Sequence, residues 1–238
     1  MISSYEINWS IPKNIGYFIS TSKTGLSKGI YKSANFSTNV GEDIRLVNSN
    51  IVELKNQLNL DNISFMNQTH SNIVLEACRN NNILNCDGIY SFDKLTSCAV
   101  LTADCIPILV TEKNGTLIGC IHAGWKGLKS KVIENFFENH NTIKREDFRV
   151  LLGPCISMER YTVNDDVFMH LSKYNKRFIK KNSVSYFMDL RYIAYDILSD
   201  LGISDVTISD ACTYNDEFYS YRKNKVTGRF ISLIWFNR

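Results

Sequence analysis

The sequence lacks the segments that would place the protein in a membrane or on an export route. None of its apolar runs reaches the roughly 18 to 20 residues of a membrane span. The first ten residues, MISSYEINWS, lack the order of a basic stretch followed by an apolar one that marks a signal peptide. We therefore expect a cytoplasmic protein with no membrane partner.

An excess of charge of one sign is also missing. The 238 residues include 27 basic and 24 acidic side chains, which leaves a net charge of +3. A protein that binds nucleic acid would normally concentrate basic side chains on one surface. The balance argues against nucleic acid as a partner and favours a small molecule.

Linkers and internal repeats are absent as well. The chain is 44% apolar and 21% charged, which is ordinary for a globular protein and excludes a disordered one. A folded chain of this length buries about 70% of its unfolded surface, so its core needs no covalent cross-links. We expect one domain over residues 1–238, with a surface loop at Asn80-Asn81-Asn82.

Histidine is scarce, and cysteine occurs in an odd number. Seven cysteines without an export signal favour free thiols or metal ligands over a disulfide framework. Two of the four histidines, His140 and His170, lie on predicted helices outside any motif, and we expect both at the surface or its boundary. Met158, Met169 and Met188 are expected to fill the core rather than to bind copper.

Hydrophobic periodicity predicts a mixture of helices and strands. Apolar residues recur at helical spacing over residues 44–60, over a segment that begins just after residues 124–127, and over residues 164–174 and 189–201. Short β-branched or apolar runs predict strands at 63–66, 73–78, 98–101, 106–111, 117–121 and 230–236. Because the two kinds of element do not alternate strictly, we expect an α/β sandwich with mixed sheets rather than a doubly wound fold.

The dipeptide Asn114-Gly115 separates two of these strands and predicts a hairpin. A type I′ turn would place both residues at positive φ. If Lys113 pairs with Thr116, the register of the whole hairpin is set. The same pairing then extends to the far ends of the two strands.

That register brings a thiol and an imidazole together. It places Cys105 opposite Gly124 and His122 opposite Pro107, so Cys105 and His122 lie on one face as diagonal neighbours. Their Cβ atoms would be less than about 8 Å apart, a separation that one metal ion can bridge. Pro107 cannot donate to the ladder, which predicts an irregular strand start or an edge strand.

A third ligand from another segment would complete a metal site. His70, just before a predicted strand, is the histidine best placed by its context. A zinc ion held by two histidines and one cysteine keeps an open position, as catalytic sites do. From spacing alone the alternative is equally good, with Cys105 and Cys120 as small core residues and His122 hydrogen-bonded at a strand end.

Several short motifs resemble one known family. The chain is similar to the bacterial laccase-domain family, also called polyphenol oxidase-like proteins and now regarded as purine nucleoside phosphorylases. The resemblance covers nearly the whole chain and implies a four-layer α/β/β/α sandwich. It is carried by Asn67-Gln68-Thr69-His70, Asp104-Cys105-Ile106-Pro107, His122-Ala123-Gly124-Trp125-Lys126-Gly127, Gly153-Pro154-Cys155-Ile156, Cys212-Thr213, Ser220-Tyr221-Arg222 and Thr227-Gly228-Arg229.

The resemblance implies a metal-dependent reaction of nucleosides. It assigns His70, Cys105 and His122 as zinc ligands, with copper as the alternative metal. The implied activity is phosphorolysis of adenosine, inosine and methylthioadenosine, accompanied by deamination of adenosine. A Lewis acid suits both reactions, since it can polarise the leaving purine or activate water. The usual signature of the separate zinc deaminases, His-x-Glu with Pro-Cys-x-x-Cys, is absent.

Further candidates surround this centre. Arg222 and Arg229, with guanidinium forks, and Lys126 near a helix start are candidate phosphate ligands, although such charge runs are commonly solvated faces. Asn35 is a candidate ribose ligand. Asp87 and Gln68 are candidates for handling a proton or orienting the base, and hydrogen bonding at a turn or strand end explains them equally well.

Three other functions compete with this one. A copper-dependent polyphenol oxidase is the first, although four histidines are too few for a multicopper cluster. A hydrolase with Cys105 as nucleophile and His122 as base is the second, and a cell-wall precursor would be its substrate. A non-catalytic zinc module is the third, and it would need a fourth protein ligand.

Overall fold

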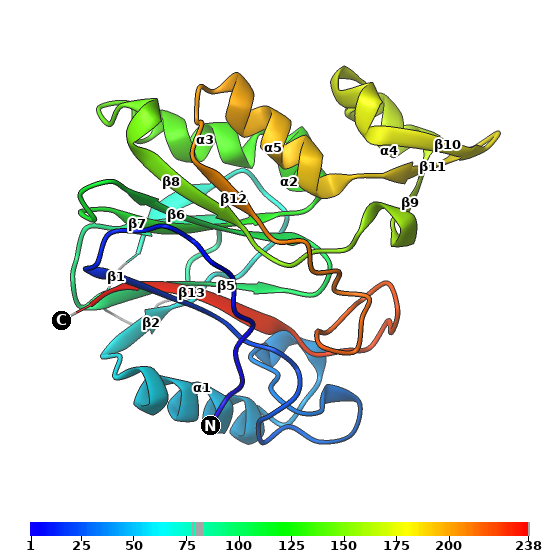
Figure 1. Cartoon of the computed structure of the whole chain (residues 1–238). Helices are drawn as coiled ribbons and strands as arrows, with labels where there is room; N and C mark the ends of the chain where they lie inside the picture. The colour runs from blue at the N-terminus through cyan, green and yellow to red at the C-terminus, as the bar shows by residue number, and fades with distance from the viewer. Residues whose placement is uncertain (78, 80–82, 238) are drawn as a thin grey trace.

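Two stacked β-sheets form the centre of the protein, and helices cover the outer face of each (Figure 1). The computed structural model describes residues 1–77, 79 and 83–237, so the loop predicted at Asn80–Asn82 and the end of the predicted strand at Cys78 lie outside the described residues. One sheet has the order β1 (Ile15–Ile19), β13 (Phe230–Phe236), β5 (Thr96–Thr102), β2 (Asn62–Ser64). The other has the order β12 (Val206–Ile208), β8 (Phe148–Leu152), β6 (Ile106–Glu112), β7 (Ile118–Ala123), β4 (Gly88–Ser91), β3 (Val74–Glu76).

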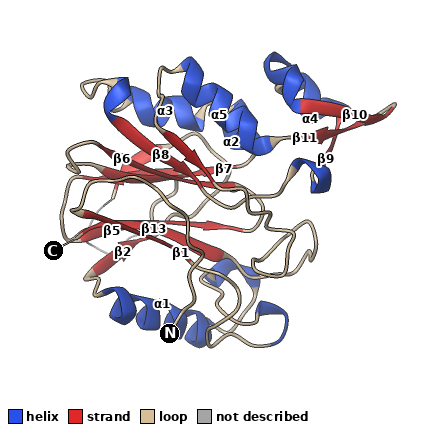
Figure 2. Cartoon of the chain, viewed as in Figure 1, coloured by secondary structure: helices blue, strands red, loops and turns tan. Residues whose placement is uncertain are grey.

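The helices make the two outer layers. Helix α1 (Ile44–Leu58) covers the four-stranded sheet, whereas α2 (Trp125–Lys129), α3 (Val132–Glu138) and α5 (Leu190–Asp200) cover the six-stranded sheet (Figures 1 and 2). Both sheets contain parallel and antiparallel pairs. The expected α/β/β/α sandwich with mixed sheets is confirmed. No helix in the described part of the chain combines the length and apolar character needed to cross a membrane.

Three apolar clusters fill the spaces between the layers. In β5, Ala99 packs toward α1 with Leu54, whereas Cys98 and Val100 point into the space between the sheets. The six-stranded sheet contributes Leu109 to that inner space and buries its other face against α3 and α5. Because both faces of these strands are covered, they read as continuous apolar runs rather than alternating ones.

Helix boundaries follow local signals where these exist. Asp43 caps α1 by accepting a hydrogen bond from the Arg45 amide, and Asp189 caps α5 as predicted. The helix predicted after residues 124–127 is instead two helices, α2 and α3. Lys131 breaks it because its φ of +68° lies in the left-handed region, which a helix cannot include.

A small third sheet was not predicted. Strands β9 (Thr162–Asn164), β10 (Phe178–Asn182) and β11 (Ser185–Met188) pair antiparallel and project from the sandwich beside α4 (Figure 2). Four of the five β10 side chains are exposed, so the segment carries no clear apolar pattern.

The helix predicted over 164–174 divides into α4 (Asp165–His170), capped by Asn164, and a 3₁₀ segment. The 3₁₀ segments are Gly29–Tyr31, Thr38–Val40, Arg145–Asp147, Met158–Arg160 and Ser172–Arg177.

The hairpin register is confirmed, but its turn type is wrong. Pro107 pairs with His122 as predicted. Gly115 has a φ of +62°, whereas Asn114 is not in the left-handed region, so the turn is not type I′. The Glu112 carboxylate holds the turn by accepting from the backbone amides of Asn114 and Thr116 at 2.8 and 2.6 Å.

Two predictions of burial are also wrong, one for a core residue and one for a surface residue. Met169 is 67% exposed rather than in the core, whereas Met188 is fully buried as expected. His140 is only 3% exposed, although His170 lies at the surface. The His140 ring packs against Tyr90 at a centroid distance of 4.3 Å, and its Nδ1 donates to the Phe136 carbonyl at 2.7 Å. This backbone bond lets a neutral imidazole replace an apolar side chain in the core.

His140 should make the protein less stable at mildly acidic pH. Burial lowers the pKa of His140 below its ordinary value of 6.5, so protonation favours the unfolded chain. The stability that depends on a neutral His140 is fully present above pH 6.5 and is lost as the pH falls below 6.5. We expect His140→Asn to reduce the slope of unfolding free energy against pH, by up to about 1.4 kcal/mol per pH unit. Urea unfolding between pH 7.5 and 5 would measure this, and parallel curves for both proteins would contradict it.

Candidate metal centre and adjoining pocket

Three side chains from separate segments converge at one end of the two sheets. His70 lies in the loop between β2 and β3, Cys105 in the turn between β5 and β6, and His122 in β7. Their ligating atoms all lie within 4.8 Å of one another. Cys105 Sγ is 3.8 Å from His70 Nε2, and the two imidazole rings meet edge to face with centroids 4.7 Å apart. The predicted trio is therefore assembled in space.

The chemistry of this donor set fits a metal ion. Two imidazoles and a thiolate are ligands that zinc and copper both accept. No fourth His, Cys, Asp or Glu joins the group in the described part of the chain. His70 is exposed and His122 is buried, so the group opens to one side. Such an arrangement can bind an ion and leave a position for substrate.

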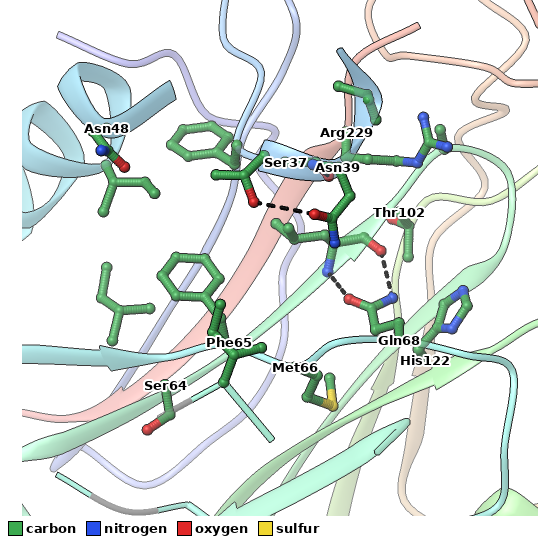
Figure 3. Close-up of a pocket in the computed structure, with 18 of the residues that line it drawn as sticks. Ser37, Asn39, Asn48, Ser64, Phe65, Met66, Gln68, Thr102, His122 and Arg229 are labelled. Atoms are coloured by element: carbon green, nitrogen blue, oxygen red, sulfur yellow. Dashed lines mark hydrogen bonds between the residues drawn. The ribbon is translucent and has the colours of Figure 1, made fainter. Parts of the chain in front are cut away.

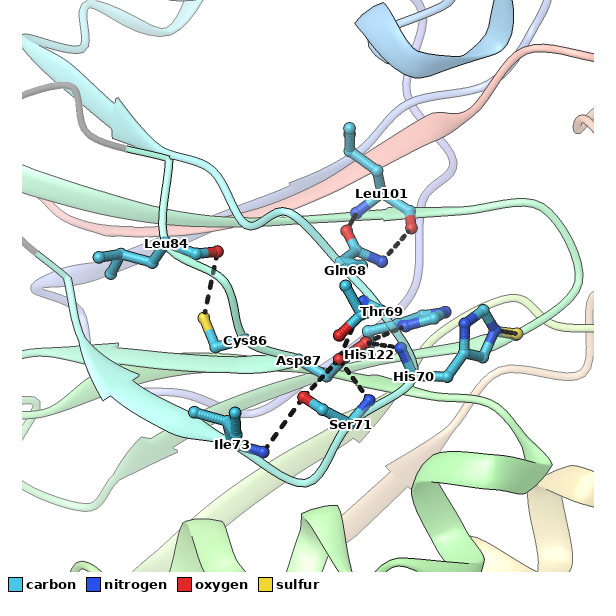
Figure 4. A network of polar contacts seen from close by, with 11 residues as sticks. Gln68, Thr69, His70, Ser71, Ile73, Leu84, Cys86, Asp87, Leu101 and His122 are labelled. Carbon is cyan, nitrogen blue, oxygen red and sulfur yellow. Dashed lines mark hydrogen bonds and ion pairs between the residues drawn. The ribbon is translucent and has the colours of Figure 1, made fainter.

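Asp87 organises the ligands from behind. This fully buried carboxylate accepts a hydrogen bond from His122 Nδ1 at 2.8 Å (Figure 4). It also accepts from the backbone amides of Thr69, His70 and Ser71 and from the Ser71 hydroxyl. Because Nδ1 is occupied, Nε2 is the atom of His122 that could bind a metal ion. Asp87 thus orients His122 and fixes the loop that carries His70.

The charges in the centre support one another. Burial alone would raise the pKa of Cys105, but the adjacent His122 and His70 lower it to about 6. Burial likewise opposes the charge of His122, yet Cys105 and Asp87 raise its pKa to about 9. In contrast, burial raises the pKa of Cys86 to about 12. Cys105 is therefore disposed to be a thiolate, the form that binds metal.

The two residues that flank Cys105 in space, Asp104 and Gly124, are tightly constrained. Asp104 has a φ of +105°, and its carboxylate accepts from the Thr213 hydroxyl at 2.7 Å and the Arg222 amide at 2.6 Å. Opposite Cys105, a Cβ on Gly124 would lie 2.8 Å from the cysteine sulfur and 3.0 Å from His70 Cδ2. Glycine is needed there because any side chain would occupy the centre.

A pocket of about 990 Å³ adjoins the three ligands (Figure 3). It extends from the centre, past the 3₁₀ segment Thr38–Val40, to helix α1 and strand β2. Its walls combine apolar side chains with about as many polar ones, and polar groups of this kind orient a ligand in small-molecule sites. The lining residues include Phe36, Asn39, Asn48, Ile51, Lys55, Phe65, Gln68, Thr102, Tyr221 and Arg229.

Two of the other predicted residues line this pocket. Arg229 is held there because its Nη1 donates to the carbonyls of Thr227 and Gly228 at 2.9 Å. Burial lowers its pKa from the ordinary 12.5. Gln68 exchanges two hydrogen bonds with the backbone of Leu101, at 2.8 and 2.9 Å. Its amide therefore anchors the start of the His70 loop to β5.

Three predicted ligands lie away from the pocket lining. Asn35 is fully buried and accepts from the backbone amide of Arg229 at 2.8 Å, so it positions that residue. Lys126 is exposed, with its Nζ 5.8 Å from the centroid of the Trp125 ring. Arg222 donates to the Thr162 carbonyl at 2.8 Å and stacks over Tyr161.

Sequence reasoning missed several of the pocket residues. Asn39, Asn48 and Thr102 belong to three separate segments that meet only in the folded chain. Thr102 had a nearby signal, since it stands two residues before Asp104 in the motif around Cys105. The two asparagines were not singled out, because asparagine is frequent throughout the sequence.

Comparison with known proteins gives a consistent result. Residues 16–237 match the family described as multi-copper polyphenol oxidoreductase laccase. A Haemophilus influenzae protein named purine nucleoside phosphorylase is 33% identical over 96% of this chain and 97% of its own. A similarly named protein of Escherichia coli is also 33% identical, over 95% and 96% of the two chains.

Solved structures share the fold. The crystal structure of Neisseria meningitidis protein NMB0706 has a TM-score of 0.93 and 32% identity, and the match covers 97% of this chain and 98% of that one. That of YlmD from Geobacillus stearothermophilus has a TM-score of 0.91 at 23% identity, covering 100% and 99%, and shows the fold alone. The chain therefore belongs to the multi-copper polyphenol oxidoreductase laccase family, together with relatives named purine nucleoside phosphorylases.

Proposed function

We propose that the protein is a zinc-dependent purine nucleoside phosphorylase that acts on adenosine, inosine and methylthioadenosine, with adenosine deamination as a companion activity. One observation carries the proposal. His70, Cys105 and His122 stand within 4.8 Å of one another at the end of a pocket that Arg229 also lines. A cation site and a guanidinium in one pocket suit a reaction between a nucleoside and phosphate. The names of the relatives at 33% identity support the same class.

In phosphorolysis, a phosphate oxygen bonds to the sugar carbon while the bond from that carbon to the purine nitrogen breaks. The purine leaves with the electron pair and takes up a proton. Zinc bound by the three ligands would supply a Lewis acid that polarises the purine or activates water. Arg229 would bind the anionic phosphate, and the apolar walls would exclude water around the reacting carbon.

The residues behind the ligands have positioning roles in this proposal. Hydrogen bonds and charge from His122 and Ser71 outweigh the effect of burial and lower the pKa of Asp87 to about 2. Asp87 is fully buried and is not among the described residues that line the pocket, so it does not face the purine in this proposal. It acts instead by orienting His122. Gln68 also has a positioning role, because both polar atoms of its side chain bond to the backbone of Leu101 and hold the His70 loop.

The test is whether base release depends on phosphate. Protein purified without added metal should contain one zinc per chain. It should release adenine or hypoxanthine only with phosphate present, and one sugar phosphate should form for each base released. Chromatography of the products and elemental analysis would measure both. Failure to release base, together with oxidation of phenols by copper-loaded protein, would overturn the proposal.

A chelator separates this reaction from the cysteine hydrolase. Removal of the metal should abolish base release, and added zinc should restore it. A hydrolase that used Cys105 as nucleophile would keep its activity without metal, and thiol alkylation alone would stop it. Deamination is followed in the same assay as conversion of adenosine to inosine without phosphate.

A further inference from the structure

Thr102 carries a hydroxyl that the folded chain leaves unsatisfied. It is the last residue of β5 and is 1% exposed, and its Oγ1 has no hydrogen-bond partner among the described residues. Valine would suit the strand equally well, because both side chains are β-branched, and would avoid burying a lone hydroxyl. The side chain lines the pocket, so a bound molecule can supply the missing partner.

The position of Thr102 indicates what that molecule is. Its cross-strand partner is Phe230, the first residue of β13, so Arg229 stands immediately before this pair in the chain. Figure 3 shows Thr102 between Arg229 and His122. The Nη1 atom of Arg229 is fixed by two carbonyls, whereas its Nε and Nη2 make no hydrogen bond within the described chain. No Asp or Glu is among the described residues that line the pocket. This corner therefore favours an anion.

We infer that Thr102 is a phosphate ligand. Its hydroxyl donates to a phosphate oxygen, while the guanidinium of Arg229 pairs with the negative charge of the phosphate. The inference rests on the proposed function and adds a residue that acts on one of the two substrates. Hydrogen bonds from a hydroxyl to an anionic oxygen are short and strong. Thr102 thus determines affinity for phosphate rather than for the nucleoside.

Steady-state kinetics with three variants test this role. Thr102→Val removes the hydroxyl and keeps the shape, whereas Thr102→Ser keeps the hydroxyl. Ser232→Ala is the matched control, because its buried hydroxyl also has no partner among the described residues but does not line the pocket. The KM for inorganic phosphate and the KM for inosine are measured separately, together with zinc content.

Thr102→Val should raise the KM for phosphate roughly 10- to 100-fold. Its KM for inosine and its zinc content should stay within twofold of wild type, and Thr102→Ser and Ser232→Ala should resemble wild type in all three measurements. An unchanged KM for phosphate, or a rise in the KM for inosine instead, would overturn the inference alone. Absence of phosphate-dependent base release in the wild type would overturn the proposed function, and the inference with it.

Discussion

Replacing Cys105 with alanine is expected to abolish metal binding and turnover while the protein stays folded. The thiolate is one of three ligands, and two imidazoles without it hold a divalent ion far less tightly. Cys105 is only partly buried and stands at the pocket rather than in an apolar cluster, so its loss leaves the core intact. We expect base release to fall by at least about 1,000-fold, since the loss of the ion removes its electrostatic stabilisation of the transition state.

The measurement needs a matched control. Cys86→Ala removes a buried thiol whose pKa is raised to about 12 and which belongs to the core between the sheets. That variant should keep its zinc and its activity but lose some stability. Elemental analysis, circular dichroism and the phosphate-dependent assay would compare the two. Full metal content and full activity in Cys105→Ala would reject the ligand set.

Replacing Asp87 with asparagine should have the second largest effect. Within the described chain, the carboxylate accepts five hydrogen bonds, from His122 Nδ1, three backbone amides and the Ser71 hydroxyl. An asparagine side chain has one oxygen, and its amide group would face donors. We expect zinc affinity to fall about 10- to 100-fold, because the partner that orients His122 is lost. Stability should also fall by about 3 kcal/mol, as for a broken buried ion pair.

A graded series separates positioning from folding. Ser71→Ala removes one of the five donors and leaves the carboxylate in place. Its zinc affinity should fall less than that of Asp87→Asn, and its unfolding free energy should drop by about 1 kcal/mol. Competition with a chromogenic chelator and urea unfolding would measure the two quantities. Equal zinc affinity in Asp87→Asn and wild type would show that Asp87 does not orient the ligand.

The number and placement of the histidines make the copper oxidase the weaker candidate. A multicopper enzyme needs a second cluster of imidazoles, and the chain has four histidines in total. His140 is buried among aromatic rings, and His170 lies on the surface beside Lys129 and Asp166. In the described part of the chain, the trio at the pocket is the single cluster of such ligands. A reaction that needs one metal ion is the better fit.

Local sequence signals predicted the elements whose causes are themselves local. The cap Asp189 was predicted from its own neighbours, and strand β13 has the predicted bounds, Phe230–Phe236. The break at Lys131 and the burial of His140 were not predictable, because no sequence signal marks the left-handed φ of Lys131 and distant aromatic residues surround His140. The turn at Gly115 also differs from the prediction. The backbone amides of Asn114 and Thr116 donate to the Glu112 carboxylate, and these side-chain bonds hold a turn that is not type I′.

Within the site, the sequence alone determined that Cys105 and His122 lie next to each other. Residues of a hairpin have fixed partners, so the register that places His122 opposite Pro107 also places Cys105 and His122 on one face. Only the tertiary structure decided the rest. His70 reaches the pair because Asp87, buried beneath both segments, bonds to its loop and to His122. Thr102 and Arg229 reach the pocket because β5 and β13 are neighbours although far apart in the chain, and contacts at such separations are set by packing rather than by local pattern.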